Sequence, residues 1–171
     1  MGNETDHVRP GDGRQPAEAG EPTAREAGWL LLFDRHDRVF LLRGSDPARP
    51  GITWWLTPGG GLHDGESPRD GALRETAEET GWSAQAGAHA CLRRDVEFTF
   101  MAKRYRQREV FYPARVGGAE DLDRSRWTME ECQSLLEGRW WTVQELRDTG
   151  DTIYPEQLAD LAESLIREGW E

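Results

Sequence analysis

The chain has 171 residues and a formal net charge of −11, from 32 acidic and 21 basic residues. This length predicts one domain whose core needs neither disulfides nor a structural metal. So acidic a chain argues against binding to long nucleic acids or anionic membranes, because contact with phosphate requires positive surface. It does not argue against small phosphorylated ligands, since a metal ion held by carboxylates can meet their charge.

The cysteines and the hydropathy pattern bear on location. Cys91 and Cys132 are the only cysteines and do not form a CxxC pair, which predicts neither a disulfide scaffold nor a zinc knuckle and favours a reducing cytoplasm. No apolar stretch approaches the roughly 20 residues of a membrane span, and the N-terminus lacks a signal-peptide pattern. We therefore predict a cytoplasmic protein without a membrane partner.

The N-terminal residues 1–27 contain almost no large apolar side chain. Such a stretch cannot bury enough surface to offset its ordering entropy. We predict a disordered or loosely docked arm over 1–27 and a folded domain over 28–171.

Within that domain, apolar runs between turn residues indicate strands, and a 3.6-residue period indicates helices. The expected strands, in chain order, cover residues 29–33, 39–42, 54–57, 84–100 and 103–116. The expected helices cover residues 67–80, 128–136, 142–146 and 155–169. The last helix carries one apolar stripe, which predicts a packed face; it consists of Leu158, Leu161, Ala162 and Leu165.

The best-defined element is the helix over 67–80. Ser67 is a favourable N-cap, Pro68 suits the first helical position, and Gly81 supplies the C-terminal stop. On a helical wheel, three glutamates share one face, opposite the residues expected to pack on the sheet. The glutamates are Glu75, Glu78 and Glu79, and the packing residues are Leu73, Thr76, Ala77 and Thr80.

Three carboxylates within one helical turn repel each other, by a few tenths of a kcal/mol or more for each pair. They form either a solvated acidic face or a site for a divalent cation, which prefers oxygen ligands. The surroundings favour the cation site. The helix follows a glycine-rich turn at 58–61, where a backbone carbonyl can face the same site, and Arg74 can reach Glu66 or Glu78.

Together, these residues form a pattern that resembles the signature of the Nudix hydrolase family, the Nudix box. The pattern reads Gly60-x5-Glu66-x7-Arg74-Glu75-x2-Glu78-Glu79-x-Gly81. At ordinary residue frequencies, seven such positions coincide by chance in about one chain in a million. Thr76 and Trp82 stand where the family prefers aliphatic residues. The resemblance implies an α+β fold, an α/β/α sandwich with a mixed central sheet flanked by the motif helix and a C-terminal helix.

The resemblance also implies the chemistry: metal-dependent hydrolysis of a small nucleoside diphosphate linked to another group, with water as the nucleophile. Mg²⁺ or Mn²⁺ is the implied cofactor, and its implied ligands are the carbonyl of Gly59 and the side chains of Glu75, Glu78 and Glu79. Catalytic roles are implied for Glu75 (sometimes the general base), Glu78 and Arg74, and Arg74 would pair with Glu66. Many members of the family are homodimers, so a homodimer is one expected state.

Two alternatives share the fold. A catalytically silent nucleotide sensor would be expected to have lost motif carboxylates, and this chain has lost none. An isopentenyl diphosphate isomerase needs a catalytic cysteine in a characteristic setting, which neither Cys91 nor Cys132 has.

In the family, an acidic residue outside the motif often completes the site. The candidates are Glu109, Glu120, Glu130, Glu131 and Glu137. We favour Glu131, because it precedes the segment 139–141 by a suitable distance.

Aromatic and basic residues supply further candidates. In the strand over 103–116, Tyr105 and Gln107 share one face and three arginines the other; the arginines are Arg104, Arg106 and Arg108. They either keep an edge strand soluble or contact substrate phosphate. Trp54 and Trp55 alternate, so only one of them can line a substrate pocket, and His63 is expected in an exposed loop.

Overall fold

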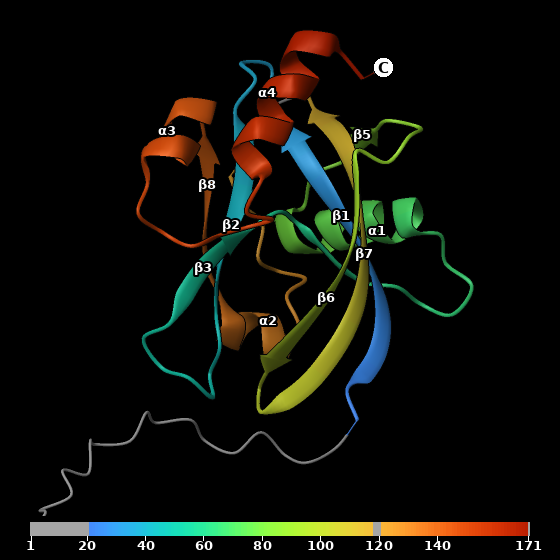
Figure 1. The fold of residues 1–171 in the computed structure, drawn as a ribbon, viewed down its shortest axis with the longest axis vertical. Coiled ribbons are helices and arrows are strands. Elements are labelled where there is room, and N and C mark those ends of the chain that lie inside the picture. The colour runs from blue at the N-terminus through green and yellow to red at the C-terminus, as the bar shows by residue number, and fades with distance from the viewer. Residues whose placement is uncertain (1–20, 118–120, 171) are drawn as a thin grey trace, which may run out of the picture.

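A computed structural model describes residues 21–117 and 121–170. In these ranges the chain forms one nine-stranded sheet and four helices (Figure 1). The strands are β1 (Thr23–Phe33), β2 (Val39–Ser45), β3 (Thr53–Leu56), β4 (Gly59–Gly61), β5 (Ala84–Ala86), β6 (Leu92–Phe100), β7 (Lys103–Val116), β8 (Leu135–Trp141) and β9 (Ile153–Tyr154). The helices are α1 (Pro68–Thr80), α2 (Met129–Ser134), α3 (Val143–Asp148) and α4 (Leu158–Glu168).

The sheet is mixed. Its main path runs β5-β7-β1-β2-β3-β9, while β4 pairs with β1, β6 with β7 and β8 with β2. β1 and β7 run parallel from the pair Thr23–Tyr105 to the pair Phe33–Arg115. β1 meets β2 at Phe33 and Val39, beside their connecting turn, whereas residues 27–29 of β1 pair with the glycine strand β4.

Helices cover both faces of the sheet, with α1 on one side and α4 on the other (Figure 1). Successive side chains of a strand point to opposite faces, so Leu30 packs in the apolar cluster that includes Ala72 of α1. Leu31 packs in the cluster that includes Leu158 and Ala162 of α4. This confirms the predicted α/β/α sandwich and the predicted apolar stripe of the last helix.

Local signals of the sequence fix the motif helix. The Ser67 hydroxyl accepts a hydrogen bond from the backbone N–H of Asp70 at 3.1 Å, and Gly81 ends the helix with a φ of 78°. Gly28 of β1 lies directly under α1, where a Cβ atom would collide with the backbone of Pro68 and approach that of Ala72. A glycine there lets the helix lie close to the strand.

Several predicted bounds were wrong. β1 begins at Thr23 rather than near residue 28, because backbone pairing with β7 orders its polar first residues; residues 1–20 of the predicted arm lie outside the described residues. The strand predicted over 84–100 is two strands, β5 and β6. The last helix begins at Leu158 rather than at residue 155.

β7 is also not an edge strand, since β1 pairs along one side of it and β5 and β6 along the other. In the part of the chain that the structure describes, no helix is long and apolar enough to cross a membrane. Cys91 and Cys132 are free thiols.

Candidate metal centre and active site

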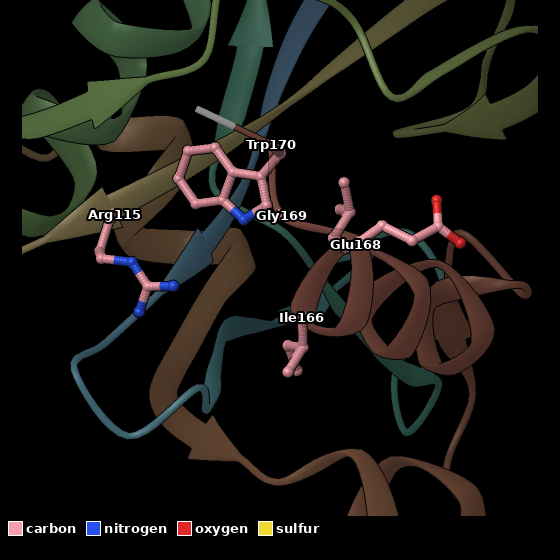
Figure 2. Close-up of a pocket in the computed structure, with 6 residues that line it drawn as sticks. Arg115, Ile166, Glu168, Gly169 and Trp170 are labelled. Carbon is pink, nitrogen blue, oxygen red and sulfur yellow. The ribbon is translucent and has the colours of Figure 1, made fainter.

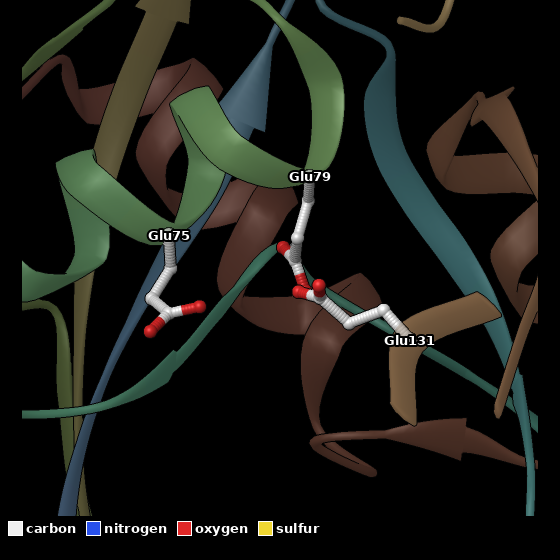
Figure 3. A group of neighbouring side chains, drawn as sticks. All are labelled: Glu75, Glu79 and Glu131. Atoms are coloured by element: carbon white, nitrogen blue, oxygen red, sulfur yellow. The ribbon is translucent and has the colours of Figure 1, made fainter. Parts of the chain in front are cut away.

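Three acidic side chains from two helices converge beside the glycine strand (Figure 3). One carboxylate oxygen from each of Glu75, Glu79 and Glu131 lies within 4.8 Å of the other two. Glu75 and Glu79 stand one turn apart on α1. Glu131 lies in the first turn of α2, where its carboxylate also accepts a hydrogen bond from the backbone N–H of Thr128 at 2.6 Å.

Glu79 is the most deeply buried member of this acidic cluster, with 5% of its surface exposed. Its Oε2 accepts a hydrogen bond from the Gly59 N–H at 2.9 Å. Burial raises the pKa of Glu79 well above its usual range, against the opposing effect of the Gly59 bond. The helical wheel placed Glu79 opposite the packing residues; the structure instead buries it together with Thr76 and Thr80.

Glu75 lies between the glycine strand and Arg74. A Cβ atom on Gly60 would lie 2.8 Å from the Glu75 carboxyl carbon, so the two groups already touch. Burial raises the pKa of Glu75, while the Arg74 guanidinium, which donates to Glu75 Oε1 at 2.6 Å, opposes that rise.

Arg74 joins the motif loop to the motif helix. Its Nε and Nη2 donate to the two oxygens of Glu66 at 2.8 and 2.9 Å, and Nη2 also donates to the Gly61 carbonyl at 3.0 Å. The Arg74 guanidinium lowers the pKa of Glu66 to about 2. The predicted pairing of Arg74 with Glu66 is therefore confirmed, and Arg74 reaches Glu78 as well, at 3.3 Å.

The predicted ligands are only partly brought together. Glu78 lies outside the acidic cluster, with 41% of its side chain exposed. Gly59 is next to the cluster through its N–H group. The roles of Glu78 and of the Gly59 carbonyl remain predictions.

Of the acidic candidates outside the motif, the structure brings Glu131 to the cluster. Glu109 is buried and pairs with Arg94 at 2.7 Å, and Glu137 pairs with Arg43 at 2.9 Å. Glu130 is exposed, and Glu120 lies outside the described residues.

The aromatic and basic candidates fall on both faces of the sheet. Arg106 and Arg108 are exposed and form ion pairs with acidic residues of β6 and β1. Trp55 is buried and packs edge-on against Trp141 at 5.0 Å, so Trp54 is the half-buried one of its pair. His63 is exposed, as expected.

Two further residues, Trp127 and Arg25, were not predicted from the sequence. Trp127 donates its indole N–H to the Glu79 carbonyl at 2.7 Å, which ties the segment before α2 to the end of α1. Arg25 donates to Gln107 and lies over two aromatic rings. Each is a single side chain far along the chain from its partner, so no local pattern points to it.

A separate hollow of about 420 Å³ lies at the end of α4 and shares no residue with the acidic cluster (Figure 2). The residues that line it are Arg115, Leu165, Ile166, Glu168, Gly169 and Trp170.

The acidic cluster fits a hard divalent cation. Its donors are carboxylate oxygens, which suit Mg²⁺ and Mn²⁺ better than softer metals. A buried carboxylate with a raised pKa is unfavourable in its ionised form unless a positive charge compensates it. Glu75 and Glu79 are two such groups, and the carboxylate of Glu131 shares their space. The chain therefore offers an anionic site that a cation would stabilise.

Comparison with known proteins agrees with this geometry. The family model of the NUDIX domain matches residues 22–161. A protein named RNA pyrophosphohydrolase from Novosphingobium aromaticivorans is 32% identical over 142 residues, which cover 77% of this chain and 78% of that protein. A protein named uncharacterized Nudix hydrolase YvcI from Bacillus subtilis is 47% identical over 50 residues, 29% of this chain and 28% of that protein.

The match to that Bacillus protein thus spans less than a third of its length. Among solved structures, the MutT protein from Methanosarcina mazei has a TM-score of 0.63 and 22% identity, covering 90% of this chain and 100% of that one, which shows a shared fold. With the family model matching most of the chain, the chain belongs to the Nudix hydrolase family, whose enzymes hydrolyse phosphoric anhydride bonds.

Proposed function

We propose that this chain is a metal-dependent pyrophosphohydrolase that cleaves a diphosphate bond in a small nucleoside diphosphate linked to another group. Water is the nucleophile. The observation that carries the proposal is the convergence of Glu75, Glu79 and Glu131 within 4.8 Å, next to the glycine strand β4.

In this proposal, Glu75, Glu79 and Glu131 hold Mg²⁺ or Mn²⁺ together with the carbonyl of Gly59. Glu78 joins them, because its exposed side chain is attached to Arg74 by one contact of 3.3 Å and is free to turn. A bound divalent ion neutralises phosphate charge, orients water and lowers the pKa of that water.

The remaining work falls to protein groups. Burial raises the pKa of Glu75, which makes its carboxylate a better proton acceptor, so Glu75 suits the role of general base. Arg74 holds Glu75, Glu66 and the Gly61 carbonyl at once, and so fixes the glycine strand relative to the helix.

Two other assignments are less well supported. A silent nucleotide sensor has no need of a complete carboxylate set, yet Glu66, Glu75, Glu78 and Glu79 are all present. The Novosphingobium relative is named an RNA pyrophosphohydrolase, which makes the 5′ end of RNA a second candidate substrate. The net charge of −11 favours the small nucleotide, because long polyanions are repelled by an acidic surface.

We also propose a cytoplasmic location, which the free thiols of Cys91 and Cys132 support. The homodimer stays a prediction, and light scattering of the purified chain tests it.

A substrate panel tests the proposed activity. Nucleotide sugars, nucleoside triphosphates, dinucleoside polyphosphates and a 5′-triphosphorylated RNA are incubated with Mg²⁺ or Mn²⁺, and phosphate is measured after phosphatase treatment of the products. We expect metal-dependent cleavage of at least one small nucleotide and its loss in Glu79→Gln. Absence of any metal-dependent cleavage by the wild type would favour the sensor, and cleavage of RNA alone would overturn the small-substrate assignment.

A further inference from the structure

Arg25 on β1 lies over two stacked aromatic rings. Its guanidinium carbon is 4.5 Å from the ring centroid of Tyr105 and 5.4 Å from that of Phe98, and the two rings are 5.4 Å apart. Stacking on aromatic faces holds a guanidinium in one plane and leaves its N–H groups directed outward. The two rings therefore form a platform that orients Arg25.

A buried chain of polar groups fixes Arg25 from behind. Its Nε donates to Gln107, whose side chain donates in turn to Glu109 at 2.6 Å, and Glu109 accepts from Arg94 at 2.7 Å. Gln107 is 1% exposed and Glu109 is 5% exposed. Buried polar groups hold a single arrangement when all of them are paired, so this chain gives Arg25 a fixed position.

The terminal nitrogens of Arg25 are the unused part of this arrangement. Nη1 and Nη2 have no hydrogen-bond acceptor among residues 21–117 and 121–170. The residue is nevertheless exposed enough for a ligand to reach it. A fixed guanidinium with two free N–H edges is suited to bidentate contact with a phosphate group.

Arg25 lies on β1 just before the residues that pair with the glycine strand, which touches Glu75 of the acidic cluster at Gly60. Two residues further along β1, Ala27 pairs with Gly61 of the glycine strand, and two strand residues span about 6.6 Å. Partial burial lowers the pKa of Arg25, while neighbouring acidic groups, Glu75 among them, act in the opposite direction. Tyr105, Glu130 and Glu109 have larger opposing effects than Glu75, which is the smallest of the four.

We propose that Arg25 binds an anionic group of the substrate that lies beyond the diphosphate at the acidic cluster. This inference rests on the proposed function and makes nucleotides with at least three linked phosphates the preferred substrates over diphosphates whose distal group is neutral. A metal ion at the acidic cluster would neutralise the charge of the diphosphate that is cut. The guanidinium of Arg25, which is held separately, is then available to bind a further phosphate. Arg25 is thus a specificity-determining residue.

The test compares two substrates in two variants. Arg25→Met removes the guanidinium under test. Arg106→Met is the control: Arg106 pairs with Ala24, the residue before Arg25 on β1, and its exposed side chain forms an ion pair with Glu97 at 2.9 Å. For adenosine triphosphate, we expect Arg25→Met to raise KM about ten- to a hundred-fold. For adenosine diphosphate ribose, whose distal group is neutral, KM stays within about twofold, and Arg106→Met changes neither value.

A binding measurement separates this inference from the proposed activity. The probe is a nucleoside triphosphate with methylene groups in place of its bridging oxygens, titrated calorimetrically in Mg²⁺. We expect Arg25→Met to bind it about tenfold or more weakly than the wild type, with Arg25→Lys intermediate because lysine keeps the charge but loses the planar stack. If Arg25→Met does not fold, Arg25→Lys against the wild type carries the comparison.

Three outcomes overturn the inference: equal binding of the probe by wild type and variant, no binding by the wild type, or an equal rise of KM for both substrates. If the wild type cleaves nothing but the variant binds the probe more weakly, the proposed hydrolysis fails and the role of Arg25 stands.

Discussion

Replacing Gly60 with alanine should damage the site while sparing the fold. The added Cβ would lie 2.8 Å from the carboxyl carbon of Glu75 and 2.9 Å from its Oε2, whereas ordinary contact begins at 3.4 Å. The carboxyl group must therefore move by at least about 0.6 Å. That movement also disturbs the 2.6 Å contact between Glu75 and Arg74.

The expected effects on activity and on stability differ in size. A displacement of about 1 Å of a catalytic group can reduce turnover about 100-fold, so we expect Gly60→Ala to lower kcat by about one to two orders of magnitude and to weaken Mn²⁺ binding. The group that must move is the end of the flexible Glu75 side chain. Replacing glycine with alanine also lowers the entropy of the unfolded chain, which stabilises the folded protein by about 0.4–1 kcal/mol. The free energy of unfolding should therefore change by less than about 1 kcal/mol.

The neighbouring glycine supplies a matched control. A Cβ on Gly61 would meet nothing within 4 Å, so Gly61→Ala should leave kcat and Mn²⁺ binding unchanged. Urea denaturation gives the free energy of unfolding of both variants, calorimetric titration gives metal binding, and the substrate identified in the panel gives kcat. If the two variants behave alike, or if Gly60→Ala keeps full activity, contact between Gly60 and Glu75 does not position the carboxylate.

Three further predictions concern stability. Because burial raises the pKa of Glu75 and Glu79, the folded metal-free protein retains protons above pH 4.5 that the unfolded chain has released, so its stability falls as pH rises above that value. Melting curves from pH 5 to 8 should show this fall in stability, which Mg²⁺ should reverse and Glu79→Gln should reduce. A wild-type melting temperature that does not change with pH would contradict the prediction. Trp127→Phe removes the bond to the Glu79 carbonyl and should lower the free energy of unfolding by about 1–2 kcal/mol in urea titrations; no change would mean that water replaces the indole. Leu158→Ala, at a side chain 1% exposed, should lower it by about 2–5 kcal/mol, against less than about 0.5 kcal/mol for the exposed Ile166→Ala, and similar losses in both would argue against packing of α4 on the sheet.

Local signals predicted the motif helix and its neighbours well. The bounds of α1 followed from Ser67, Pro68 and Gly81, each of which acts through groups within a few residues of itself. The pairing of Arg74 with Glu66 was predictable for the same reason, because Arg74 lies in α1 and Glu66 lies in the loop directly before it. The strand over 103–116 was predicted with the bounds of β7.

Features set by long-range pairing were not predictable in this way. Glu79 was expected on the outer face of α1, but β4 lies against that part of the helix and buries the side chain. The polar start of β1 at Thr23 is ordered by its partner β7, of which its own residues give no sign. Glu131 was favoured among the acidic residues outside the motif from its distance to residues 139–141, and the structure does bring it to the acidic cluster. The approach of α2 to α1 that places it there is a long-range feature that no local pattern predicts.

The parallel ladder of β1 and β7 has a consequence for how the chain folds. Each pair in it, from Thr23 with Tyr105 to Phe33 with Arg115, joins residues 82 positions apart. Closing so long a loop carries a large entropic barrier, and ladders of this kind form slowly. During synthesis the centre of the sheet cannot be completed until residue 115 has left the ribosome. Until then α1 lacks the part of its packing surface that β7 supplies through Val110, Tyr112 and Ala114, so its carboxylates come together with Glu131 as a metal-binding group only late in folding.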